Sequence, residues 1–337
     1  MNTVIQRPLP DETMSSWAWR VFNENTHHSE KIELHNAFYA TKTLDPDFNF
    51  STPFSYVLQK ISGMNALELK SFFSIGGSIV LPRLARYSYC YRCMEDSIKN
   101  VGLPFWRKSW CCVFNPVCDR HGVMLLDGNS YDAEDYNAPG LMFITHANTQ
   151  FPKRGKNLAI QFSEQWYGKR YIDAALNAFR FYSNMPDNSL SSQSTSLKRL
   201  WKYVYVALTV CHCARFGGRV ESAMKHGMRM PSGRKDGGLV IQSLANSLYA
   251  ATSTRTEALF YCGVVFGVFE IGPYGVESFG YAPMDSLILG RLVRREKPRV
   301  ADWLVTRLSP NAHILHPATE QFLIGLNIEP ASYGSRF

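Results

Sequence analysis

The chain has 337 residues, enough for two or three domains, and its 45% hydrophobic and 19% charged residues are typical of a folded protein. This composition excludes a largely disordered chain, and the lack of any run of 18 apolar residues argues against a membrane span. The N-terminus has no apolar signal segment, so we expect a cytoplasmic protein whose eight cysteines stay reduced.

The formal net charge of +8 is unevenly distributed along the chain. Residues 1–80 carry a net charge of −2, residues 81–130 carry +3, and residues 131–190 are neutral. Residues 191–337 hold 17 basic and 10 acidic side chains, or +7. Positive charge concentrated in one region favours a nucleic-acid partner for that region.

Helices are predicted through residues 1–80, which we expect to form an N-terminal domain. Over residues 11–25 the apolar side chains recur at helical spacing: Met14, Trp17, Ala18, Val21 and Phe22. Asp11 and Glu12 place negative charge at the expected start of this helix. A second helix is predicted over residues 31–41, followed by a turn at residues 45–47.

The outline of a helix-turn-helix follows at residues 52–73. Thr52 and Pro53 are suited to begin a helix, and Gly63 to end it in the left-handed conformation. Asn65 then caps a second helix, with Glu68 in the capping-box position.

This helix pair has two interpretations. A DNA-reading second helix should carry basic or amide side chains for bases and phosphates. The second helix offers Asn65, Lys70 and Ser71 beside Glu68, within a segment of net negative charge. We therefore favour protein contact or homodimer formation through Asn65, Glu68 and Lys70 over DNA reading.

A metal site is predicted in residues 81–128, which show little helical periodicity. Cys90 and Cys93 form one C-x2-C knuckle, and after 24 intervening residues Cys118 and His121 form a C-x2-H knuckle. Two such knuckles can supply four ligands to one tetrahedral zinc ion, which leaves no open position and predicts a structural site. Cys111 or Cys112 could replace a ligand, but after Trp110 these two cysteines are better interpreted as small apolar packing residues.

The first 128 residues resemble the TniQ family, which includes the TnsD-type target selectors of bacterial transposons. The opening motif of proline, acidic residues and a Ser-Trp helix is matched by Pro8, Pro10, Asp11, Glu12, Ser15, Ser16, Trp17 and Arg20. The zinc module is matched, in order, by Arg86, Tyr87, Cys90, Cys93, Asp96, Gly102, Pro104, Trp106, Trp110, Cys118, His121, Gly122 and Leu125. Tyr91 and Asp119 stand where the family has proline, and residues 122–190 contain no cysteine, so we predict one zinc ion and not two.

The resemblance implies a function in transposition. TniQ-like proteins connect a target-recognition element to the transposon's AAA+ ATPase, and through it to the transposase. That element is a CRISPR effector such as Cascade with its guide RNA, or the protein itself reads an attachment site in DNA, as TnsD does. The length favours the adaptor, because direct readers of this family tend to carry a further large C-terminal domain.

Beyond residue 128 only the residues themselves guide the interpretation. Residues 129–164 are polar and predict a linker or surface excursion, and residues 165–337 predict a basic helical C-terminal domain. Helices are expected at 166–181, 197–216 and 239–252, with a Gly-rich basic loop at 231–238. Residues 263–280 are compatible with a strand or a buried helix.

Two basic clusters mark this C-terminal region. The first holds Lys198, Arg199, Lys202, Arg215, Arg219, Lys225, Arg229, Arg234 and Lys235. The second holds Arg291, Arg294, Arg295, Lys297 and Arg299. The interleaved aromatic residues Trp201, Tyr203, Tyr205 and Phe216 favour contact with a DNA or RNA backbone, and a solvated surface is the other interpretation.

Catalytic motifs are missing from the sequence, and we do not expect an enzyme. There is no phosphate-binding Gly-x4-Gly-Lys-Ser/Thr loop and no zinc-deaminase signature. Cys211, His212 and Cys213 are adjacent on an expected helix, so their side chains diverge and cannot share one ion. The predicted fold is mainly α: a helix-turn-helix N-terminal domain, a small zinc-knuckle module and a helical C-terminal domain.

Overall fold

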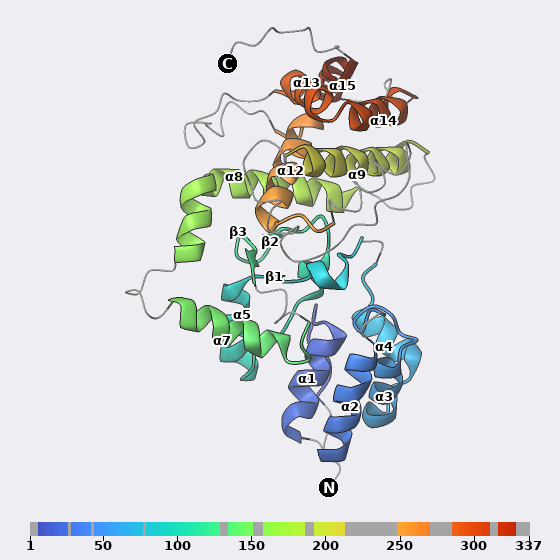
Figure 1. Ribbon diagram of the computed structural model, residues 1–337, viewed down its shortest axis with the longest axis vertical. Helices are drawn as coiled ribbons and strands as arrows, with labels where there is room; N and C mark the ends of the chain where they lie inside the picture. The colour runs from blue at the N-terminus through green and yellow to red at the C-terminus, as the bar shows by residue number, and fades with distance from the viewer. Residues whose placement is uncertain are drawn as a thin grey trace. The chain divides into compact units, whose positions relative to one another are not determined.

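The chain is mainly helical, as predicted (Figure 1). It divides into two compact units. A computed structural model describes residues 6–25, 28–41, 44–76, 79–128, 134–150, 158–185, 192–212, 248–269, 285–310 and 316–327. The first unit comprises residues 1–121 and 125–159, and the second comprises 122–124 and 160–337. The predicted domain boundaries at residues 80, 128 and 164 stay predictions.

Over its described residues, the first unit is built from short helices, three short strands and two 3-10 turns. Its helices are α1 (Met14–Asn25), α2 (His28–Ala40), α3 (Pro53–Ser62), α4 (Ala66–Phe73), α5 (Tyr91–Val101) and α7 (Ala138–Gln150), with short 3-10 helices η1 (Arg83–Ala85) and η2 (Lys108–Cys111). Its strands are β1 (Ser88–Tyr89), β2 (Val117–Cys118) and β4 (Leu126–Asp127). β1 pairs antiparallel with β4, with Ser88 opposite Asp127 and Tyr89 opposite Leu126.

Helices α1 to α4 share one aromatic core. The ring of Trp17 lies 5.5 Å from those of Phe22 and Phe73, and all three side chains are buried. The remaining buried members come from all four helices, and those of α1 are the residues that periodicity predicted: Met14, Ala18, Val21, Leu34, Phe38, Phe54, Leu58 and Leu69. Burial of this stripe, more than intrinsic propensity, stabilises helices of eight to thirteen residues.

The α3–α4 pair begins and ends as the sequence predicted. Thr52 Oγ1 accepts a hydrogen bond from Ser55 N at 3.1 Å, and Gly63 ends α3 with φ of 71°. Asn65 Oδ1 accepts from the amides of Leu67 and Glu68 at 2.9 and 3.0 Å, while the Glu68 carboxylate accepts from Asn65 N at 2.8 Å. A helix, a glycine turn and a second helix are therefore present, and what the pair binds stays a prediction.

Two helices lie where the sequence analysis expected irregular chain. Helix α5 runs through the zinc module, beginning directly after Cys90 and ending at Gly102 with φ of 83°. The buried face of α5 consists of Cys93, Met94 and Ser97. Two of these three are a cysteine and a serine, so the sequence lacks the regular pattern of large apolar residues that predicts a helix. Helix α7 and the start of α8 occupy much of residues 129–164, so this segment is not irregular as expected, and its role as a linker or surface excursion stays a prediction.

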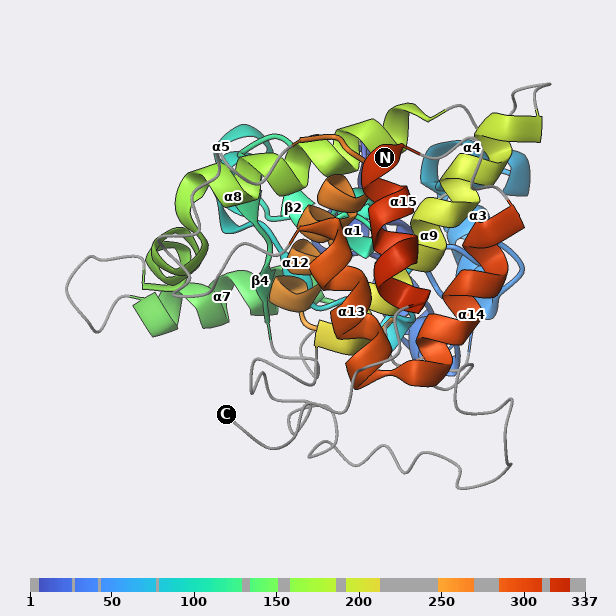
Figure 2. The same cartoon turned by 90° about the horizontal axis from the view of Figure 1, so that it is seen from above.

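The second unit is also helical. Its elements are β3 (Val123–Met124), α8 (Leu158–Asn184), α9 (Ser192–His212), α12 (Thr252–Val265), α13 (Ser286–Glu296), α14 (Pro298–Leu308) and α15 (Pro317–Asn327). Figure 2 shows α13 and α15 side by side, and a Cβ atom at Gly290 or Gly325 would collide with the backbone of the opposite helix. Glycine at both positions thus permits this close approach.

The other C-terminal predictions are only partly covered by the described residues. The helices expected at 166–181 and 197–216 correspond to α8 and α9, whose described part ends at His212. The loop at 231–238 and the first part of the helix expected at 239–252, residues 239–247, lie outside the described residues. In the remainder of that expected helix, residues 248–250 are non-helical and α12 begins only at Thr252. Over the described part of 263–280 the chain is helical to Val265 and then turns. None of the described helices is long and apolar enough to span a membrane.

Candidate metal centre

Two tight turns bring the predicted ligands together inside the first unit. Cys90 follows β1 and is the residue before α5, and Cys93 lies in the first turn of that helix. Cys118 ends β2, and His121 lies in the turn that follows it. Gly122, with φ of 59°, has the left-handed conformation that lets the chain leave this second knuckle.

The donor atoms have the spacing of a tetrahedral site. The Cys93 and Cys118 sulfurs are 3.6 Å apart, and His121 Nδ1 lies 3.5, 3.2 and 3.6 Å from the sulfurs of Cys90, Cys93 and Cys118. A tetrahedron with usual zinc bond lengths places sulfurs about 3.8 Å apart and sulfur from nitrogen about 3.6 Å apart. The four side chains can therefore hold one metal ion without rearrangement.

All four coordination positions would be filled by protein. The three cysteines are at most 2% exposed, and the His121 side chain is 17% exposed. A tetrahedral ion held by four protein ligands has no position for water or substrate, which is the pattern of a structural site. Hydrogen bonds among the three thiols lower the pKa of Cys118 and raise the pKa values of Cys90 and Cys93, so binding of a metal ion by three thiolates would release protons from the latter two.

Asp96, named above only as part of the family motif, is a further member of the site. Its Oδ2 atom lies 3.1 Å from His121 Nε2, the ring nitrogen that faces away from the cysteines, and 3.2 Å from Arg120 Nη2. A carboxylate on the second nitrogen fixes the orientation of a metal-binding imidazole and raises its basicity. The sequence spacing could have predicted this position of Asp96, because Asp96 is three residues after Cys93 and lies on the same side of α5.

Cys111 and Cys112 do not join the cluster, which agrees with the favoured interpretation of these residues. The Cys111 thiol is buried and lies 3.7 Å from the Arg107 carbonyl oxygen, and the Cys112 thiol lies 3.7 Å from that of Lys108. Burial raises the pKa of Cys111 well above its usual value, so it packs as a neutral thiol.

The N-terminal motif packs directly against the tryptophan motif of the zinc module. Thr13 N donates to the Trp106 carbonyl at 3.0 Å, and Trp106 N donates to Ser16 Oγ at 2.8 Å. Asp11 accepts hydrogen bonds from both the amide and the hydroxyl of Ser109, at 3.0 and 2.6 Å. Segments some 90 residues apart in the sequence are thus joined by the residues that carry the resemblance.

The comparison with family models identifies the N-terminal part of the chain. Residues 4–125 match the model described as TniQ. The chain carries a TniQ domain. Such a domain marks a transposition-associated protein. No curated protein and no solved structure matches the chain.

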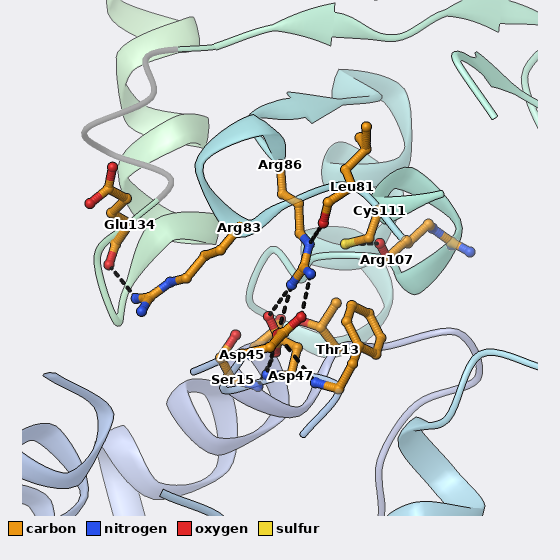
Figure 3. A network of polar contacts seen from close by, with 12 residues as sticks. Thr13, Ser15, Asp45, Asp47, Leu81, Arg83, Arg86, Arg107, Cys111 and Glu134 are labelled. Carbon is orange, nitrogen blue, oxygen red and sulfur yellow. Dashed lines mark hydrogen bonds and ion pairs between the residues drawn. The ribbon is translucent and has the colours of Figure 1, made fainter. Parts of the chain in front are cut away.

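Two ion pairs, one fully buried and one half-buried, lie within the TniQ domain. Glu12 accepts two hydrogen bonds from Arg20, at 2.8 and 2.9 Å, and both side chains are almost fully buried. Arg86 donates to both oxygens of Asp45 and, at 2.7 Å, to the Leu81 carbonyl, as Figure 3 shows. Burial opposes ionisation of Asp45, but the hydrogen bonds and charge of Arg86 outweigh it and lower the Asp45 pKa.

Tyr91, which replaces the family's proline after the first zinc ligand, packs against helix α7. Its ring stacks on Phe143 with centroids 5.4 Å apart and on His146 at 3.9 Å. The Tyr89 hydroxyl also lies 3.0 Å from His146 Nδ1. A departure from the family pattern thus connects the metal knuckle to the helix that follows the domain.

The described basic residues of the second unit differ in what they can bind. Arg199, Arg291 and Arg295 are exposed, whereas Arg294 pairs with Asp302 and donates to the Leu326 carbonyl. Lys198 donates to the Met185 carbonyl at 3.1 Å and lies over the Tyr182 ring, so its ammonium group contributes to packing within the second unit. Lys202 is half-buried, and Arg215, Arg219, Lys225, Arg229, Arg234 and Lys235 lie outside the described residues.

The aromatic residues between these cations are mostly core. Trp201 and Tyr205 are fully buried, which corrects the expectation that they interleave with the cations on a binding surface. Tyr203 is half-buried at the surface, and Phe216 lies outside the described residues. A helix repeats every 3.6 residues, so residues 201 and 205 lie on the same face and residue 203 lies on another. This spacing explains why Trp201 and Tyr205 are buried while Tyr203 reaches the surface.

Proposed function

We propose that this protein is a target-selection adaptor that recruits a transposon's AAA+ ATPase and transposase to a target bound by a Cascade-like CRISPR effector with its guide RNA. The TniQ domain at residues 4–125 carries this proposal. We further propose that the ion held by Cys90, Cys93, Cys118 and His121 is zinc, because three thiolates and one imidazole in a tetrahedron suit that metal.

The chemistry of the site supports a binding function and not a catalytic one. Zinc would supply Lewis-acid character only where a coordination position is open, and these four protein ligands would leave none open. The site instead joins the end of β1, the start of α5 and the β2 turn. Holding these segments together supports the surface that a partner would contact.

Exposed apolar side chains on the helix-turn-helix support protein contact. Leu67, in the first turn of α4, is 78% exposed, and Tyr56 on α3 is 60% exposed. Asn65 and Glu68 are exposed too, although each caps the other's backbone, and Lys70 is exposed beside them. Apolar residues such as Leu67 and Tyr56 bind another protein better than they bind phosphate.

The experiment is to map insertion sites in cells that carry the transposon genes, the effector genes and one of two unrelated guide RNAs. An adaptor predicts that insertions move when the guide is exchanged and that they disappear when this gene is deleted. Insertion at one attachment site regardless of the guide would contradict the adaptor and favour a TnsD-like protein that reads the site itself.

A further inference from the structure

Helices α9 and α14 of the second unit lie side by side (Figures 1 and 2). Each helix carries at least one exposed arginine. We infer that the surface formed by Arg199, Tyr203, Trp303 and Arg307, here named the α9–α14 face, binds the phosphate backbone of duplex DNA. This inference rests on the proposed function, because a target selector works beside its target DNA.

Two ring contacts build the face. The rings of Tyr203 on α9 and Trp303 on α14 meet edge to face, 5.1 Å apart. The Arg307 guanidinium lies over the Tyr203 ring, 6.0 Å from its centre, and the residue is exposed. An aromatic ring beneath a guanidinium restricts its motion while leaving its N–H donors free to bind an anion.

Helical spacing places further arginines beside the two rings. Arg199 of the face is exposed and lies one turn before Tyr203, and Arg299, next to the face, is exposed and lies one turn before Trp303. Helix α9 contains no acidic residue, and the one in α14, Asp302, is paired with Arg294 of α13. The field over the face is therefore positive and suits a polyanion.

The shape of the face favours a duplex over a single strand. Proteins that bind single strands usually stack bases on exposed aromatic rings. Here Tyr203 and Trp303 are half-buried and pack against each other, so neither ring is presented as a stacking platform. Two adjacent helices with arginines at their surface can instead contact phosphates through charge and hydrogen bonds, without reading sequence.

The test is binding of the full chain to a duplex of scrambled sequence, followed by fluorescence anisotropy over a series of salt concentrations. We expect Arg199→Gln with Arg307→Gln to weaken binding at least tenfold at low salt. The slope of log affinity against log salt should become shallower by about two, because each lost phosphate contact removes about 0.9. Both side chains are exposed and only Arg307 contacts a ring, so the thermal melting curve should shift only slightly.

The matched control removes two exposed lysines from other helices, with Lys99→Gln on α5 and Lys169→Gln on α8. It changes net charge equally and should leave the affinity and slope of the parent. The inference is overturned if the parent does not bind duplex, if both double variants lose affinity alike, or if the arginine variant loses none. Tighter binding of single-stranded RNA, lost in the arginine variant, would also overturn it. This assay contains no effector or guide, so its failure is distinct from failure of the guide-exchange experiment.

Discussion

Replacing Glu12 by Gln should strongly destabilise the TniQ domain, because it removes the charge that compensates Arg20. The Glu12 and Arg20 side chains are 0% and 3% exposed, and the Glu12 carboxylate accepts three hydrogen bonds, two from Arg20 and one from Leu9 N at 2.9 Å. Breaking a buried pair from one side costs about 3–5 kcal/mol, since the remaining ion stays desolvated. We expect that loss in the free energy of unfolding of the first unit.

The assay is urea unfolding followed by tryptophan fluorescence, since Trp17 and Trp19 lie in the helix that carries Arg20. Glu33→Gln is the matched control. Glu33 pairs with Lys60 at 2.9 Å, but their side chains are 40% and 68% exposed, and such surface pairs contribute about 0–1 kcal/mol. An equal loss of unfolding free energy in the two variants would refute the argument that burial determines how much an ion pair contributes to stability.

Three further predictions test other parts of the molecule. Asp96→Asn should weaken metal binding about 10- to 100-fold in competition with a chelator, because His121 loses a carboxylate partner, whereas Glu95→Gln one position earlier should not. Leu67→Ser should change the free energy of unfolding by no more than about 0.5 kcal/mol, since Leu67 is 78% exposed. The same variant should weaken capture of the AAA+ ATPase or effector. Unchanged capture of both would remove Leu67 from the proposed contact. Burial raises the pKa of Glu257 to about 8 from 4.5, so ionisation costs the folded second unit stability as pH rises from 4.5 to 8. Glu257→Gln should therefore stabilise this unit at pH 7, by up to about 3 kcal/mol, and flatten its dependence on pH, which thermal melting at several pH values would measure.

Features that depend on neighbours in the sequence could be predicted. The caps of α3 and α4 follow from Thr52, Gly63 and Asn65, because each acts on backbone groups within four residues. The metal ligands could also be predicted, since a C-x2-C or C-x2-H turn aims two side chains at one point whatever surrounds it.

Contacts between distant segments could not be predicted in the same way. Nothing local in Asp11 or Ser16 indicates that they bind the segment around Trp106, some 90 residues away. Helix α5 was missed because Cys93 and Ser97 fill its buried face, and the pairing of Arg294 with Asp302 depends on how α13 and α14 pack. In each case tertiary packing determines the contacts or the secondary structure of a residue whose local sequence is compatible with several.

The most direct test of the central claim is the metal content of the purified chain, measured by elemental analysis beside protein concentration. The four-ligand site predicts about one zinc per chain, lost in Cys118→Ser and kept in Cys111→Ser, whose thiol packs apart from the cluster. Two zinc ions per chain, none, or loss of the ion in the Cys111 variant with retention in the Cys118 variant would contradict the assignment.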